Sequence, residues 1–286
     1  MVDDRDPPAP SGRDPYRIAM GVEYDGTGFS GWQVQAQSVR TVQGCLEAAI
    51  GRVADRPVTI HCAGRTDAGV HALEQVIHFE TAAERSMRAW VLGTNTNLPA
   101  DVAVRWAVRV SEAFHARFSA IARHYRYLIL TRATRSALER ERAVWVHRPL
   151  DLAAMQRAAA ALVGEHDFSS FRAIACQAKS PVRRVHYLEL RQRGELIELH
   201  IGANGFLHHM VRNIAGVLLA IGRGEAPVAW TRELLALRDR TLGGVTAPPN
   251  GLYLARVDYP PEHALPQVAD RERAAGQTGD TTEMPG

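Results

Sequence analysis

Apolar residues alternate with polar or small ones in several short stretches of this chain. In the clearest stretch, Ile18, Met20, Val22 and Tyr24 recur at every second position before a turn at Asp25. A period of two places alternate side chains on one face of an extended strand. Further strands are predicted at residues 58–62, 75–79, 124–131, 187–191 and 196–201, with a hairpin turn at 192–195.

Three other stretches repeat apolar residues every three or four positions, which predicts helices. The first follows Thr41, a residue type that caps helix N-termini, and reaches Val53. The second follows Asp151 and stops at Gly164. The third spans residues 206–221 and ends at Gly222. Each half of the chain therefore combines strands with one or two covering helices.

This order of elements predicts an α/β (α+β) protein with a mixed, mostly antiparallel sheet in each half. A chain of 286 residues is long enough for two units. We expect an N-terminal subdomain over residues 16–112 and a C-terminal subdomain over 113–262. Residues 1–15 and 263–286 are polar and rich in Pro, Gly and acids, which predicts a disordered arm and a disordered tail.

Positive charge is concentrated in the body of the chain. The formal net charge is +3, but the two ends carry nine acids and four bases, so the body carries +8. Residues 113–138 hold no acid, while five arginines and two histidines alternate with Phe114, Phe118, Tyr125 and Tyr127. Cations beside aromatic rings suit unstacked RNA bases. A solvated strand face with ordinary core aromatics is the competing interpretation.

Other features bear on the protein's environment. Three cysteines without metal-ligand spacing indicate reduced thiols and a cytoplasmic protein. The longest apolar run, near residues 214–221, is too short for a membrane span, and the acidic start does not resemble a signal peptide. No Gly-rich nucleotide-binding motif occurs, so ATP and NAD are not expected.

Asp67 is the leading candidate for chemistry. It lies in the loop GRTDAG at residues 64–69, where the glycines allow unusual backbone conformations, and His71 follows. A carboxylate held on such a loop can act as a nucleophile or a base. Without other evidence, an aspartate in an ordinary turn remains the simpler interpretation.

Two distant residues strengthen this hypothesis. Arg212 is the only charge within the predicted helix 206–221, and a partly buried guanidinium needs a carboxylate partner. We therefore expect an Asp67–Arg212 pair that keeps Asp67 ionised. Arg212 could instead reach solvent or bind a phosphate. Tyr125, on the basic strand, could stack on a base or move a proton, or belong to the core.

His208 and His209 are not expected to bind a metal. Adjacent histidines are expected to point in different directions on a helix, and no Cys or carboxylate shows a suitable spacing. The sequence therefore predicts neither a metal nor a cofactor.

Several of these motifs together resemble the tRNA pseudouridine synthase A family. The matching segments, in the family's order, are residues 24–33, 62–72, 114–119, 123–127, 167–172, 206–214 and 251–254. The likeness runs from about Tyr16 to Tyr259 and omits both ends. It implies two RRM-like or ferredoxin-like halves that form one continuous sheet.

The resemblance also implies an activity and a set of roles. Members of this family convert uridine to pseudouridine at positions 38, 39 and 40 of the tRNA anticodon stem-loop, as homodimers without cofactor. Asp67 matches the nucleophile, Arg212 its ionic partner and Tyr125 the residue stacked on the target base. Arg65 matches the residue that fills the space left by the flipped base. Residues matching tRNA contacts are Arg85, Phe114, His115, Ala116, Arg117, Phe118, Ala175, Cys176, Gln177, Ala178 and Lys179.

The chemistry is compatible with these roles. Every atom of pseudouridine is already present in uridine, and Tyr125 is a candidate acceptor for the C5 proton. Asp67 would either attack C1′ or remove a proton from C2′. Two rival functions are a non-catalytic RNA-binding module and a hydrolase with an Asp nucleophile. The hydrolase would require a metal cluster or a second, acid-acting carboxylate, and neither is evident in the sequence.

Overall fold

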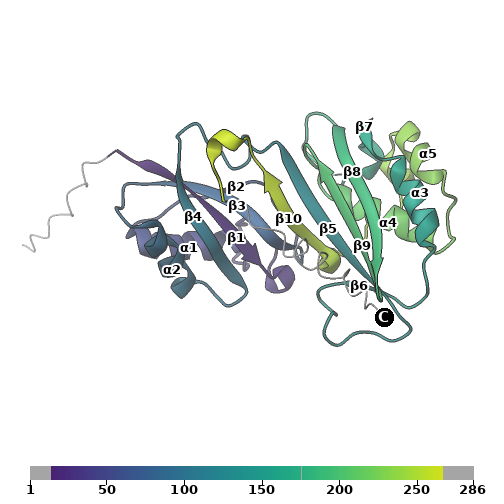
Figure 1. The fold of residues 1–286 in the computed structure, drawn as a ribbon, viewed down its shortest axis with the longest axis horizontal. Coiled ribbons are helices and arrows are strands. Elements are labelled where there is room, and N and C mark those ends of the chain that lie inside the picture. Colours follow the sequence, from purple (N-terminus) through teal and green to yellow (C-terminus); the bar gives the residue numbers. More distant parts are fainter. Residues whose placement is uncertain (1–13, 175, 267–286) are drawn as a thin grey trace, which may run out of the picture.

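The computed structural model describes residues 14–174 and 176–266, whose ten strands form one sheet (Figure 1). The strands are β1 (Tyr16–Tyr24), β2 (His61–Cys62), β3 (His71–Thr81), β4 (Val102–Val110), β5 (Ala122–Thr131), β6 (Val144–Val146), β7 (Gly164–Asp167), β8 (Val182–Arg193), β9 (Leu196–Ala203) and β10 (Leu252–Asp258). Their order is β4-β1-β3-β10-β5-β9-β8-β7, with β2 paired to β3 and β6 to β5. Only the β10–β3 and β5–β6 pairs are parallel among these. The predicted mixed, mostly antiparallel sheet is confirmed.

Helices cover the two ends of this sheet. They are α1 (Val42–Ala54), α2 (Met87–Asn97), α3 (Leu152–Ala160), α4 (Met210–Gly222) and α5 (Trp230–Leu237). Figure 1 shows α1 and α2 near β1 and β4, and α3, α4 and α5 near β7, β8 and β9. Strands β3, β10 and β5 lie between these two groups. The middle of the sheet is therefore where segments from both halves of the chain meet.

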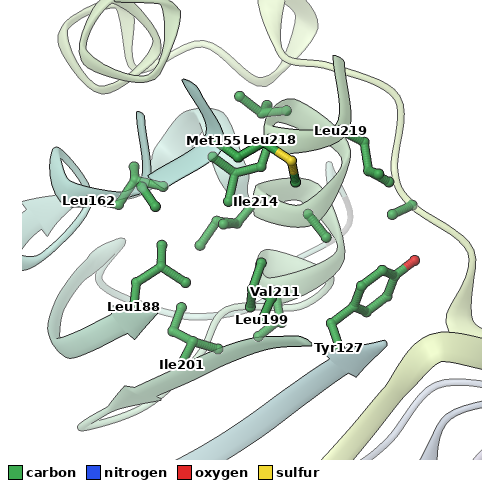
Figure 2. Packing of buried hydrophobic residues seen from close by; sticks show 14 of the residues in the cluster. Tyr127, Met155, Leu162, Leu188, Leu199, Ile201, Val211, Ile214, Leu218 and Leu219 are labelled. Atoms are coloured by element: carbon green, nitrogen blue, oxygen red, sulfur yellow. The ribbon is translucent and has the colours of Figure 1, made fainter. Parts of the chain in front are cut away.

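Each group of helices closes its own core. Apolar residues of α1 and α2 pack against β1, β3 and β4, with Phe79 and Trp90 fully buried. In the other core, Val211, Ile214 and Leu218 of α4 pack over the strand residues Leu199 and Ile201 (Figure 2). Burial of apolar surface is the main stabilising contribution to such cores.

Strand β10 joins the two cores. Its residue Tyr253 pairs with His71 at the start of β3, and Leu254 pairs with Tyr125 of β5. Two strand spacings, about 10 Å, therefore separate the start of β3 from Tyr125. The sequence did not predict β10, because a seven-residue segment near the end of the chain gives no sign that it pairs centrally. The subdomain boundary near Glu112 remains an expectation.

The predicted helix starts are confirmed for α1 and α3. The Thr41 hydroxyl accepts a hydrogen bond from Gly44 N, and the Asp151 carboxylate accepts one from Ala154 N. The predicted start of the third helix is wrong, since α4 begins at Met210 and not at Phe206. His209 has a left-handed backbone with φ 62°, which cannot continue a right-handed helix.

Smaller sequence predictions can also be compared with the structure. The predicted strand 58–62 is paired only at His61 and Cys62. Cys45, Cys62 and Cys176 are free thiols, as expected. The predicted arm and tail lie largely outside the described residues. Within the part of the chain that is described, each helix is too short or too polar to cross a membrane.

Candidate active site

The loop that carries Asp67 connects β2 to β3 and is fixed by distant side chains. Gln75 of β3, fully buried, donates to Gly64 O at 2.6 Å and accepts from Gly64 N at 3.3 Å. At the other side of the loop, Trp32 N donates to Thr66 O at 3.0 Å, and the Tyr24 and Thr66 hydroxyls lie 2.8 Å apart. The backbone on both sides of Asp67 is therefore held in place.

One of the two glycines in this loop has the backbone geometry that the sequence suggested. Gly69 has φ 77°, a backbone conformation that residues with a side chain rarely adopt. A Cβ at this position would also lie 3.0 Å from Pro249. Gly64 has no positive φ, and a Cβ there would make ordinary contact, 3.8 Å from the Tyr125 hydroxyl. A Cβ at Gly64 would therefore meet the Tyr125 hydroxyl without a clash.

His71 fixes the end of the loop where β3 begins. Its Nδ1 accepts a hydrogen bond from Gly26 N at 3.0 Å, while Nε2 lies 2.9 Å from Glu141 O. Both ring nitrogens of His71 therefore have backbone partners. The imidazole thereby ties Asp67's loop to the segment after β1 and to the loop before β6.

Asp67 and Arg212 form the ion pair that the sequence predicted. Arg212 Nη1 donates to Asp67 Oδ2 at 3.0 Å, and Arg212 Nε donates to Ala247 O at 2.9 Å. The side chains are 15% exposed for Arg212 and 24% exposed for Asp67, so the pair is shielded but a ligand can reach the carboxylate. Arg212 also lies in the first turn of α4, whose positive end favours a nearby anion.

Two histidines also contact the carboxylate. His208 Nε2 lies 3.3 Å from Asp67 Oδ1, and His209 Nε2 lies 3.3 Å from Oδ2. The expectation that adjacent histidines point apart is wrong here. Both precede α4, and the left-handed backbone of His209 brings the two rings to a centroid distance of 4.0 Å. No sequence pattern revealed this convergence.

The Asp67 carboxylate and the two imidazoles are close enough together to hold a metal ion. Among the described residues, Asp67, His208 and His209 have ligand atoms within 4.8 Å of one another. The Arg212 guanidinium already provides a positive charge at Oδ2, where it would repel a cation. We therefore keep the expectation of no metal as a proposal.

Tyr125 reaches the same region from β5. Its ring contacts Phe206 edge-on at a centroid distance of 5.0 Å, and its hydroxyl faces the space above Gly64. Burial, and next the negative charge of Asp67, raise the pKa of Tyr125 well above its usual value. The side chain is therefore a neutral phenol at physiological pH, and a neutral phenol is a weak proton acceptor.

The remaining predicted contacts separate into exposed and buried residues. Arg65, Arg85, Arg117, Gln177 and Lys179 are exposed. The Asp67 loop leads into the start of β3, and Arg85 lies four residues beyond the other end of this eleven-residue strand, which is about 33 Å long. A ligand that contacts both ends of β3 must therefore be extended.

Within the segment 114–118, the structure corrects two predicted contacts. Phe114 and Ala116 are fully buried, so their side chains pack in the protein and do not face a ligand. Phe118 is 76% exposed, with the Arg117 guanidinium 5.5 Å from its ring centroid. The sequence could not show which of these four residues are buried, because they lie in an irregular turn that has no helical or strand periodicity.

His115, the remaining residue of this segment, stabilises the turn from inside. Its Nδ1 accepts hydrogen bonds from Arg117 N at 3.1 Å and Phe118 N at 3.3 Å. Burial lowers the pKa of His115. The neutral ring thus supports the exposed pair at residues 117 and 118.

Beneath this turn, burial lowers the pKa of His78 to about 3, and the charges of His115 and His61 contribute. Below about pH 6.5, His78 binds a proton in the unfolded chain but stays neutral in the folded protein. The free energy of unfolding therefore falls as the pH is lowered, until the pH reaches the folded-state pKa of His78.

We therefore expect the wild-type Tm to fall by about 2–4 °C when the pH is lowered from about 7 to about 5. This fall corresponds to a loss of about 1 kcal/mol in the free energy of unfolding, after allowance for solvent screening of His78. His78→Asn should reduce this fall, because asparagine does not titrate in this pH range. Asparagine can still accept the hydrogen bond from Ala116 N. Thermal unfolding of both proteins at each pH measures the difference. Equal pH dependence in both proteins would contradict this role of His78.

The predicted segment 175–179 lies beside the histidine pair. Ala173 N donates to His208 O at 2.8 Å, and Cys176 N donates to Ala173 O at 3.0 Å. Cys176 and Ala178 pack against the core, whereas Gln177 and Lys179 face solvent. Ala175 lies outside the described residues. The exposed members of this segment are therefore available to a ligand at Asp67.

Comparison with known proteins shows extensive similarity. A family model described as tRNA pseudouridine synthase matches residues 20–119 and 158–260. A tRNA pseudouridine synthase A of Nitrosococcus oceani is 61% identical over 253 residues, which cover 88% of this chain and 97% of that protein. Those of Alcanivorax borkumensis and Pseudomonas aeruginosa are each 57% identical, covering 87% and 88% of this chain and 94% and 88% of their own lengths.

Proposed function

Since this chain belongs to the tRNA pseudouridine synthase A family, a family of isomerases, we propose that it converts uridine to pseudouridine at positions 38, 39 and 40 of the tRNA anticodon stem-loop. The observation that carries the proposal is the Asp67–Arg212 pair at 3.0 Å, on a fixed loop beside Tyr125. It provides an ionised carboxylate that remains accessible to a sugar.

The target base has to leave the helical stack before it can reach Asp67. Extruding a base costs a few kcal/mol, and groups that replace its stacking and fill its space offset this. Tyr125 provides an aromatic surface next to Asp67. Arg65, exposed two residues before Asp67, occupies the space that the base leaves.

The reaction then breaks the N1–C1′ bond, rotates the uracil and forms a C5–C1′ bond. Asp67 either attacks C1′ or takes a proton from C2′, and its ionised form serves both. Arg212 stabilises that ionised form and orients it. No atom is added or removed, so the chemistry requires no cofactor.

The exposed cations form the tRNA surface in this proposal. Arg117 with Phe118, Lys179 and Arg85 contact the backbone or unpaired bases of the tRNA. The same family resemblance leads us to propose a homodimer that acts in the cytoplasm.

Removal of zinc is expected to leave the activity within about twofold of its starting value, because Arg212 supplies the positive charge at Asp67. The measurement is pseudouridine formation after incubation with the zinc chelator TPEN, with Mg²⁺ retained to fold the tRNA. TPEN saturated with zinc beforehand is the control. A loss of activity that added zinc restores would show that Asp67, His208 and His209 hold a metal.

The proposed sites of modification are tested by mapping pseudouridine with carbodiimide in tRNA from cells that lack the gene. We expect the modification to disappear at positions 38, 39 and 40 and to return with the wild-type gene. If tRNA from those cells is unchanged while the purified protein binds tRNA, the RNA-binding-module function would be favoured instead.

A further inference from the structure

The two imidazoles beside Asp67 have no part in the reaction as proposed above. Each places Nε2 at 3.3 Å from one carboxylate oxygen, on the side chain that handles the ribose. A group this close to Asp67 is also close to the carbon atoms that react there. The histidine pair is therefore within reach of any proton released from the base or the sugar.

The backbone of His209 is arranged to direct its ring to this position. With φ 62° and ψ 3° it is left-handed, and it caps α4 through the bond from Asn213 N to His209 O at 2.9 Å. Conformations of this kind are unfavourable for residues other than glycine and occur often at functional sites. If this position served only the backbone, glycine or asparagine would adopt the left-handed conformation at a lower cost than histidine.

His209 is also kept in the form that can accept a proton. Burial lowers its pKa, and the charges of His208, Arg212 and Arg240 lower it further, whereas Asp67 acts in the opposite direction. The ring is 30% exposed, against 47% for His208. His209 is therefore the better shielded of the two rings, and it shares Asp67 Oδ2 with Arg212.

Tyr125, the acceptor that the sequence suggested, is poorly suited to that task. Its raised pKa keeps the phenol protonated, and the nearby Asp67 charge opposes formation of a phenolate. Tyr125 can position the uracil and contact its face. Another group must take the proton, and general bases have to lie within about 2.6–3.2 Å of the donor atom.

We propose that His209 is the general base that removes the C5 proton in the last step of the isomerisation. This inference rests on the proposed function, since it concerns the same reaction. It applies whether Asp67 attacks C1′ or deprotonates C2′, because both routes lead to the same C5–C1′ bond.

After the C5–C1′ bond has formed, C5 carries both that bond and its hydrogen, and the ring has a double bond between N1 and C6. The neutral imidazole of His209 takes this hydrogen as a proton on the ring nitrogen that carries no hydrogen. The C5–H electron pair forms the C5–C6 double bond, and the N1–C6 pair moves to N1, which is protonated by solvent. The imidazolium then loses its proton to solvent, so the net change is isomerisation alone.

The test uses His209→Gln and His209→Asn in single-turnover assays with tRNA that carries deuterium at C5 of the target uridines. Asparagine tolerates the left-handed backbone, so this second variant keeps the fold of the segment. His208→Gln is the matched control, since it removes the neighbouring imidazole from the other carboxylate oxygen. Binding of tRNA and circular dichroism verify that each variant is folded.

Both His209 variants are expected to react about 10²-fold or more slowly, with a larger deuterium isotope effect than the wild type, because C5–H cleavage becomes limiting. The His208 variant should keep the wild-type isotope effect. The proposal is overturned if the His209 variants keep their rate, or if they slow down with the isotope effect unchanged. A wild-type protein that forms no pseudouridine would contradict the proposed function itself.

Discussion

Replacing Asp67 with asparagine is expected to reduce pseudouridine formation by about 10³-fold or more, as loss of an essential nucleophile or base does in other enzymes. Asparagine has nearly the same shape and can still accept the hydrogen bond from Arg212 through its amide oxygen. It has no negative charge with which to attack C1′ or to take a proton from C2′. The main-chain bonds that fix the loop at Gly64 and Thr66 do not involve the Asp67 side chain.

Binding of tRNA should remain within about threefold of wild type in this variant, because phosphate contacts dominate affinity and Asp67 makes none. Binding is measured by filter retention and product by carbodiimide mapping, on the same preparation. Asp101→Asn is the matched control, since Asp101 forms a comparable pair with Arg40 at 2.7 Å. If Asp67→Asn kept more than about a tenth of the activity, the assignment of Asp67 would be wrong.

Replacing Arg212 with methionine is expected to reduce both activity and stability. The variant loses the ion pair with Asp67 and the bond to Ala247 O, and it leaves a shielded carboxylate without its partner. Breaking a fully buried pair costs about 3–5 kcal/mol, and the partial exposure of this pair reduces that to about 2 kcal/mol. We expect a rate loss of about 10²-fold or more, since the guanidinium no longer holds the Asp67 carboxylate in position.

Arg212→Lys separates charge from geometry. Lysine keeps the positive charge, but its single ammonium cannot bond to Asp67 and Ala247 in the arrangement of the planar guanidinium. This variant should recover most of the stability and only part of the rate. Denaturant unfolding and single-turnover rates measure the two effects, with Arg40→Met as the control. Full activity in Arg212→Met would show that Asp67 does not depend on this arginine.

The Asp67–Arg212 pair could be predicted because its evidence is local to each residue. An arginine among apolar helix residues needs an anion, and a glycine-flanked aspartate could supply one. The helix starts at Thr41 and Asp151 were predictable for the same reason, since a cap is decided within one turn. Features of this kind require no knowledge of the tertiary fold.

Features set by distant partners could not be predicted. The buried amide of Gln75 stabilises Gly64 across eleven positions, and β10 pairs with strands more than a hundred residues earlier. The convergence of His208 and His209 on Asp67 depends on one left-handed residue, which a helical pattern does not reveal. Phe114 and Phe118 are both aromatic neighbours of cations in the sequence, and only the packing decides that one is buried and the other exposed.

We propose that Asp67 and its neighbours isomerise uridine in tRNA without a cofactor. The most direct test of this proposal is a single-turnover reaction of the purified protein with an unmodified tRNA transcript that has uridine at positions 38, 39 and 40. We predict that carbodiimide mapping will detect pseudouridine at these positions, with no other small molecule than Mg²⁺ added. Binding of the transcript without pseudouridine at any of the three positions would contradict the account.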